Sequence, residues 1–147
     1  MNLSFAVKRW LEPKRLARIC KKDFGIDHIQ FSWDIIDPWW PEAQRDVMIR
    51  DFREAFEEAG LTIDSTFGGT ASYSYAHLLA PSKEQREAAF IFFKRAIDLM
   101  VGLGSKVMGT PVGAYSYDDA RNPERSEMLY QEMLDYVRQL AAYGKTK

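Results

Sequence analysis

The sequence is poor in the residues that build metal sites and disulfides. Its 147 residues include one cysteine, Cys20, and two histidines, His28 and His77. A single cysteine cannot form a disulfide within one chain, and no HxH, HExxH or CxxC pairing occurs. The sequence therefore predicts no disulfide framework and no complete metal site within this chain.

Several other functional signatures are also missing. The sequence has no GxxxxGK phosphate loop and no GxSxG elbow, and Gly102 and Gly104 form only a GxG after a helix-like stretch. No apolar run approaches the roughly 20 residues that a membrane helix needs. The net charge of −1 disfavours a broad surface for nucleic acid or anionic lipid. We therefore expect a cytoplasmic protein that binds neither nucleic acid nor membrane.

What the sequence does contain is a repeated unit in which a helix-like stretch meets a glycine and then a short apolar segment. The glycines are Gly25, Gly60, Gly104 and Gly144. The candidate strands are Leu3–Val7 at the start, then Ile29–Trp33, Leu61–Ser65 and Val107–Thr110. The spacing matches one βα unit per repeat, and a fifth strand would be due where the sequence stops.

Apolar residues between these strands recur at the spacing of one helical face. The four stripes are Leu16, Ile19, Cys20 and Phe24; Met48, Phe52, Ala55, Phe56 and Ala59; Ala89, Phe93, Ala96, Ile97 and Met100; and Leu129, Met133, Val137 and Leu140. Pro13, Ser82 with Gln85, and Asn122 with Pro123 are suited to helix starts. We expect Cys20 to pack as a small apolar residue.

The strand candidates alternate in character. Ile29, Phe31 and Trp33 oppose Gln30, Ser32 and Asp34; Leu61, Ile63 and Ser65 oppose Thr62, Asp64 and Thr66; and Leu3, Phe5 and Val7 oppose Ser4, Ala6 and Lys8. Central strands of a doubly wound sheet are usually apolar on both faces, whereas barrel strands can present a polar inner face. The pattern favours an α/β fold in which residues 1–147 form the N-terminal (βα)4 half of a TIM barrel, with parallel strands and outer helices.

In such a barrel, functional groups lie at the carboxyl ends of the strands and in the loops that follow. Here those loops are 8–10, 33–40, 66–81 and 110–121, which hold many of the tryptophans and tyrosines. Aromatic rings beside a few polar groups suit a polyhydroxylated ligand, although the same rings could roof the barrel or form a subunit contact. His77 lies in such a loop, whereas His28 precedes its strand at the opposite end and is expected to be structural.

The strand and loop sequences resemble a known group of enzymes. The residues that carry the resemblance are 29–34 (IQFSWD), 66–69 (TFGG), 75–81 (YAHLLAP), 95–99 (RAIDL), 103–106 (LGSK) and 109–113 (GTPVG). Together they are similar to the sugar phosphate isomerase/epimerase superfamily with a xylose isomerase-like TIM barrel, over nearly the whole chain.

The resemblance implies a metal-dependent isomerase or epimerase that moves a proton next to the carbonyl of a ketose. It implies a divalent metal (Mn, Mg or Co) held by acidic and histidine side chains of strands five to eight, beyond this chain, so no catalytic residue or metal ligand is assigned within it. What it carries over is a sugar-binding set: Trp33, Phe67 and His77, with Lys8, Asp34 and Pro111 as further candidates. We expect this half alone to be inactive.

Two other hypotheses remain. A half-barrel with open sheet edges could associate with itself, forming a homo-oligomer, or bind a partner as a stand-alone module. The same barrel also occurs in apurinic endonucleases, but the sequence lacks a basic patch and the histidines expected at the ends of strands two and three. The identity of the sugar, and the choice between isomerase and epimerase, stay open.

Overall fold

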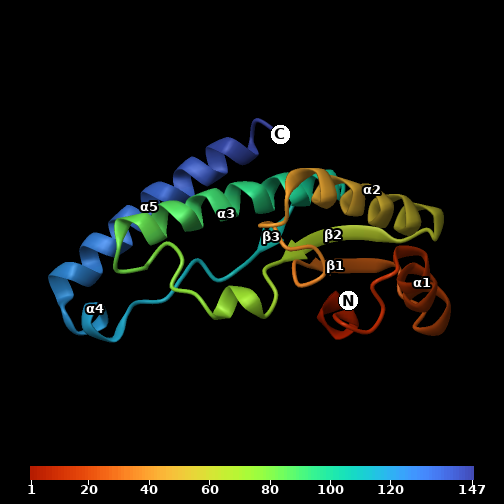
Figure 1. Cartoon of the computed structure of the whole chain (residues 1–147), viewed down its shortest axis with the longest axis horizontal. Coiled ribbons are helices and arrows are strands. Elements are labelled where there is room, and N and C mark those ends of the chain that lie inside the picture. Colours follow the sequence, from red (N-terminus) through yellow and green to blue (C-terminus); the bar gives the residue numbers. More distant parts are fainter.

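Parallel strands and the helices that follow them build the structure, a computed structural model that describes residues 1–147 apart from the side chain of residue 71. Among these residues one sheet forms, in the order β1 (His28–Ser32), β2 (Thr62–Phe67), β3 (Met108–Gly109), with both pairings parallel. Helices α2 (Glu42–Glu58) and α3 (Lys83–Gly102) connect the strands and cover one face of the sheet (Figure 1). The predicted α/β half-barrel with parallel strands and outer helices is confirmed.

Apart from the short 3-10 helix η3 (Ala71–Tyr73) in the loop after β2, the remaining helices lie toward the two ends of the chain. The first part comprises the 3-10 helix η1 (Leu3–Ala6), α1 (Pro13–Arg18) and the π-helical turn η2 (Ile19–Asp23). The last part comprises α4 (Tyr117–Arg121) and α5 (Pro123–Gly144), and α5 packs alongside α3 (Figure 1). None of the helices described here is both long and apolar enough to cross a membrane.

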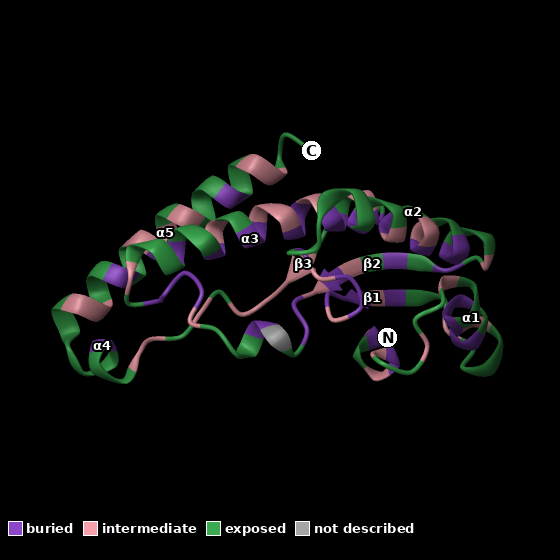
Figure 2. Ribbon diagram, viewed as in Figure 1, coloured by how far each residue is buried: buried purple, intermediate pink, exposed green. Residues whose placement is uncertain are grey.

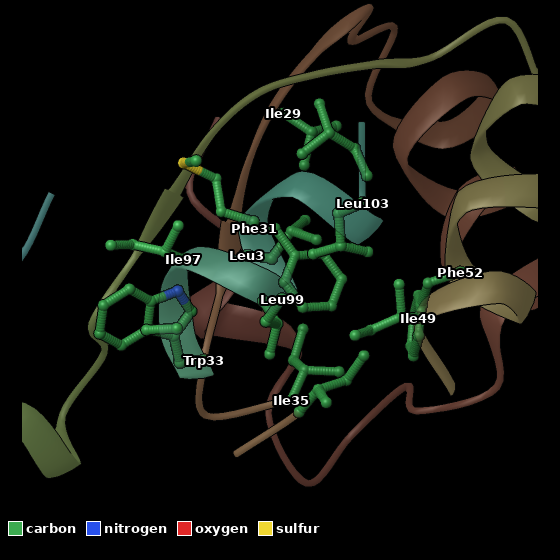
Figure 3. Close-up of a cluster of buried hydrophobic side chains, with 14 of the residues drawn as sticks. Leu3, Ile29, Phe31, Trp33, Ile35, Ile49, Phe52, Ile97, Leu99 and Leu103 are labelled. Carbon is green, nitrogen blue, oxygen red and sulfur yellow. The ribbon is translucent and has the colours of Figure 1, made fainter. Parts of the chain in front are cut away.

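The core lies between the sheet and the helices. Phe31 of β1 meets Phe52 of α2 edge to face, with ring centroids 5.3 Å apart, and both rings are fully buried. Figure 3 shows Leu3 from η1 and Leu99 from α3 in the same cluster. In α2 and α3, which cover the sheet, burial follows the sheet-facing side and leaves much of the opposite side exposed (Figure 2), as the apolar stripes predicted.

Most of the predicted helix signals are confirmed. Ser82 accepts a hydrogen bond from the Gln85 N–H, and Asn122 caps α5 in the same way through the Arg125 N–H. Cys20 is fully buried, and burial raises the pKa of its thiol. Two stripe members are more exposed than predicted: Phe24 lies at the surface where η2 ends, and Val137 lies at the solvent-exposed edge of the buried face of α5.

The predicted first strand, Leu3–Val7, is wrong. Only Asn2 pairs with β1, through a parallel bridge to Gln30, and the chain then turns into η1. The Asn2 side chain accepts a hydrogen bond from the Ser4 N–H, which starts that turn. Leu3 and Ala6, three residues apart, are both fully buried. The period of three places them on one side of a 3-10 turn, so the alternation read from the sequence was local coincidence.

A bulge in β2 corrects the predicted inner face of that strand. Ile63 pairs with Ile29, but the next pair is Ser65 with Gln30, so Asp64 is the extra residue. Beyond the bulge the faces exchange: Thr66 lies beside Phe31 and is fully buried toward the helices, and Phe67 takes the inner position. The inner face is indeed polar earlier along the strands, where Gln30 bonds both Asn2 and Ser65.

The edge of the sheet at β3 has no neighbour among the described strands. The predicted strand Val107–Thr110 shortens to Met108–Gly109, because only these residues pair with β2. The carbonyls of Val107 and Gly109 accept hydrogen bonds from the N–H groups of Thr66 in β2 and of Gly68, which follows the strand. In a parallel ladder the alternate residue faces the other way, so the Met108 N–H and C=O point to the open edge.

Candidate functional site

A pocket of about 820 Å³ lies at the carboxyl ends of the strands, under the first half of α3. Its walls come from three of the four predicted loops and from one face of that helix. The lining residues are Ser4, Val7 and Lys8; Trp33, Asp34, Asp37, Pro38, Trp39 and Trp40; Gly68, Thr70, Ser72, Tyr75, Ala76, His77 and Ala80; and Gln85, Ala88, Ala89 and Phe92. The topology therefore brings together segments that are distant in the sequence, as expected for a βα barrel.

The loop after β1 carries two carboxylates with defined backbone partners. Asp34 accepts a hydrogen bond from the Thr70 N–H at 2.8 Å, and its Oδ2 lies 3.3 Å from the Ser32 hydroxyl. Asp37 accepts from the Trp39 N–H at 2.8 Å in a local turn. Asp34 thus joins the loop after β1 to the loop after β2, and Asp37 shapes the turn that presents Trp39 and Trp40.

Two glycines of the loop after β2 fit closely around this junction. Gly69 has φ +66°, and a Cβ there would lie 2.5 Å from the Asp34 carboxylate. A Cβ on Gly68 would lie 2.5 Å from the Thr110 hydroxyl and 2.6 Å from the Ser72 hydroxyl, which donates to the Gly68 carbonyl. Only glycine allows this close approach of the backbone to polar side chains.

His77 forms part of the pocket wall in an unusual backbone conformation. Its φ is +45°, and its Nε2 lies 3.0 Å from the Ser72 carbonyl. The ring is buried, stacks on Phe92 and packs against Phe93. Burial lowers the pKa of His77, which favours a neutral ring whose Nε2–H donates to Ser72.

The loop after β3 pairs with the backbone segment that carries His77. Gly113 forms an antiparallel bridge with His77, and the Leu78 N–H donates to the Val112 carbonyl. A Cβ on Gly113 would collide with the Ala76 carbonyl, so this contact requires glycine. The fourth predicted loop therefore holds the third in place and does not itself line the pocket.

Two arginines donate hydrogen bonds to backbone carbonyls at the end of the loop after β2. Arg86 is buried and donates to the carbonyls of Ala80 and Pro81 at 2.8 and 3.0 Å, while its other terminal nitrogen contacts both carboxylate oxygens of Glu132. Arg125 reaches the Pro81 carbonyl at 2.6 Å and pairs with Asp119. These contacts tie the pocket loop to α3, α4 and α5.

Phe92 of α3 contacts three other aromatic rings that line the pocket. Its ring contacts Trp33, Trp39 and His77 at centroid distances of 5.8, 5.7 and 5.7 Å. Sequence reasoning missed it, because the neighbouring Phe93 satisfied the predicted stripe. The sequence did contain a signal for it: two adjacent phenylalanines, Phe92 and Phe93, make the apolar face of α3 wider than one stripe, so that it also reaches the loops.

The structure brings four of the six predicted sugar-binding residues to this pocket. Trp33, Asp34, Lys8 and His77 line it. Phe67 and Pro111 do not: the Phe67 ring lies on the inner face of the sheet above Gly109, and Pro111 is half-buried after β3. His28, expected to be structural, begins β1 and pairs with Asp64 outside the pocket.

The pocket offers binding groups of mixed character. The aromatic rings of the walls can stack on the C–H faces of a ligand. The Lys8 ammonium and the carboxylates of Asp34 and Asp37 can form hydrogen bonds with its hydroxyl groups. Within the described part of the chain, no three His, Cys, Asp or Glu side chains gather as a metal ligand set. The residues present therefore do not fit a metal by themselves.

Comparison with known proteins places this arrangement in a wider group. Residues 20–147 match the family described as xylose isomerase-like TIM barrel. The chain is 26% identical over 145 residues to the D-erythrulose 1-phosphate 3-epimerase of Brucella abortus (strain 2308), covering 98% of this chain and 46% of that protein.

Solved structures give the same picture. A candidate xylose isomerase from Rhodospirillum rubrum superposes with a TM-score of 0.97 at 47% identity, covering 99% of this chain and 49% of that one. D-psicose 3-epimerase from Clostridium cellulolyticum H10 superposes with a TM-score of 0.66 at 16% identity, covering 90% of this chain and 43% of that one, and shares the fold. The chain thus spans about half the length of the relatives it matches.

Proposed function

Because the chain belongs to the xylose isomerase-like TIM barrel family, we propose that it supplies the N-terminal, sugar-binding half of a metal-dependent isomerase or epimerase. The observation that carries this proposal is the match to the Rhodospirillum rubrum structure, which covers almost all of this chain and half of the other. The relative from Brucella abortus, named for epimerisation of a ketose phosphate, supports the same reaction class.

The proposed substrate is a small sugar or sugar phosphate, and the pocket under α3 is its binding site. In this proposal Trp33 and Phe92 provide apolar walls, Lys8 and Asp34 bond hydroxyl groups, and neutral His77, stacked on Phe92, extends the aromatic wall. Phe67 and Pro111 lie outside this pocket, and Phe67 would meet substrate only from the inner face of the sheet. Their assignment as binding residues stays a prediction.

Proton transfer beside a carbonyl needs a base at the carbon and an electrophile at the oxygen. A divalent metal (Mn, Mg or Co), implied by the resemblance, would supply the electrophile. Since the described residues hold no ligand set for it, we assign its ligands and the proton-transfer groups to the other half of the barrel. The role of this chain is to bind and orient the sugar.

A chimera tests the proposal. The remaining half of the Rhodospirillum rubrum protein, fused after Lys147, should form a folded barrel that interconverts ketoses and stops when EDTA removes the metal. This chain alone should show no turnover. A folded chimera that turns over no member of a ketose and ketose phosphate panel, with or without added metal, would refute the assignment.

A second candidate function is favoured by the open edge at β3. The outward Met108 N–H and C=O could pair with a strand of another copy or of a partner protein. Sedimentation velocity distinguishes the two: a stable monomer at micromolar concentration rules out self-association, and dimers that dissociate when Met108 is replaced by proline support it.

A further inference from the structure

Arg95 lies beside the pocket wall without lining the pocket. Its guanidinium carbon is 5.1 Å from the centroid of the Trp39 ring, within the range of a cation–π contact. Phe92, one helical turn earlier on α3, contacts the same indole with its ring centroid 5.7 Å away. Residues three apart are neighbours on a helix surface, so α3 presents a cation and an apolar ring to one tryptophan.

The backbone that carries Trp39 is fixed separately. Asp37 accepts the Trp39 N–H through its side chain and the Trp40 N–H through its carbonyl. Arg45 of α2, which is buried, reaches the Pro38 carbonyl at 3.5 Å. These contacts set the path of the loop, but none of them sets the side-chain torsions of the indole.

Trp39 is 47% exposed as a residue and still lines the pocket. A ring this exposed has few packing partners, so a stacked guanidinium is a large share of what fixes its rotamer. Arginine suits this task because its guanidinium is planar and lies flat against an aromatic face, whereas the lysine ammonium is a compact point charge.

We propose that Arg95 is a positioning residue: together with Phe92, it holds the Trp39 indole as a preformed wall of the pocket and thereby sets the width available to a sugar ring. This inference rests on the proposed function for its substrate. The order of the indole, however, is a property of this chain alone and can be measured without any ligand.

Fluorine NMR of the chain labelled with 5-fluorotryptophan tests the positioning role. The four tryptophans give four resonances, assigned by replacing each with phenylalanine. Arg95→Ala should shift or broaden the Trp39 resonance and leave those of Trp10 and Trp33 in place, and Arg95→Lys should restore it in part. Arg138→Ala, which removes an exposed arginine of α5, is the matched control and should move none of them.

Two results would overturn the positioning role. One is a Trp39 resonance that is unchanged in Arg95→Ala. The other is an equal shift of all four resonances, which would mean that the substitution disturbs the whole fold.

Titration with D-tagatose then tests the consequence for binding, using the chain and the chimera described above. Arg95→Ala should weaken the apparent affinity about two- to fivefold, the range expected for one partly exposed cation–π contact. Equal affinity in variant and wild type would contradict the role in setting the pocket. If neither D-tagatose nor any other member of the ketose and ketose phosphate panel moves a resonance of the wild-type chain or chimera, the proposed sugar site fails, while the ligand-free spectra still decide the role of Arg95.

Discussion

Replacing Gly69 with alanine should destabilise the protein far more than replacing Gly25, although the two glycines share nearly the same backbone conformation. Their φ angles are +66° and +63°. An alanine at either position pays about 1–2 kcal/mol for the left-handed conformation. Around Gly25 there is nothing within 4 Å of the added Cβ, so Gly25→Ala should carry only this conformational cost.

At Gly69 the added Cβ would lie 2.5 Å from the Asp34 carboxylate, which must move. That movement breaks the 2.8 Å hydrogen bond from the Thr70 N–H, and a hydrogen bond to a charged group contributes about 1.5–3 kcal/mol. The expected cost of Gly69→Ala is therefore about 2.5–5 kcal/mol, against about 1–2 kcal/mol for Gly25→Ala.

Urea unfolding followed by circular dichroism measures both values, with equal m-values as the check on two-state behaviour. A double-mutant cycle isolates the clash: in an Asp34→Ala background, Gly69→Ala should cost no more than Gly25→Ala. Equal costs for the two glycine variants in the wild-type background would refute the reasoning, because the contact with Asp34 would then contribute nothing.

Substitutions at Phe92, His77 and Glu132 test the packing and charges around the pocket. Phe92→Ala should lower the free energy of unfolding by about 3–5 kcal/mol and Phe92→Leu by much less, since leucine keeps most of the volume; similar losses in urea unfolding would contradict this. Burial lowers the pKa of His77, so below the usual value of 6.5 the unfolded chain binds a proton that the folded chain resists, and stability is lost as the pH falls. His77→Asn should therefore lose less stability than wild type between pH 7 and pH 5, and parallel curves would exclude the effect. Glu132→Gln should cost about 2–4 kcal/mol by leaving Arg86 buried without its counter-charge, whereas Glu127→Gln, at an exposed position of α5, should cost almost nothing.

Local signals in the sequence were enough for most of the helices and for the two longer strands. The stripe Ala89, Phe93, Ala96, Ile97 and Met100 is buried throughout, and Ser82 caps the helix where its residue type and spacing indicated. Such features depend on residues within one or two turns of each other, so a linear pattern contains them.

The candidate site was predicted in part. The family resemblance implied Trp33, Asp34, Lys8 and His77, and all four line the pocket. Trp33, Asp34 and His77 lie in loops after strands, where the carboxyl ends of parallel strands share one edge of the sheet, whereas Lys8 follows the 3-10 helix η1. Phe67 was misplaced relative to the pocket, and Phe92 was missed. Both depend on the exact packing of α3 and β2, which no local pattern records.

The sequence by itself determined the βα order, the parallel half-barrel and the polar inner surface of β1, because helical and strand periodicities act over short distances. Only the tertiary structure decided that residues 3–6 turn instead of extending, since that choice depends on how Leu3 and Ala6 fit beneath the sheet. It also decided that a single extra residue, Asp64, exchanges the faces of β2. Register is set by pairing with a neighbouring strand, and a one-residue shift turns every later side chain to the opposite face.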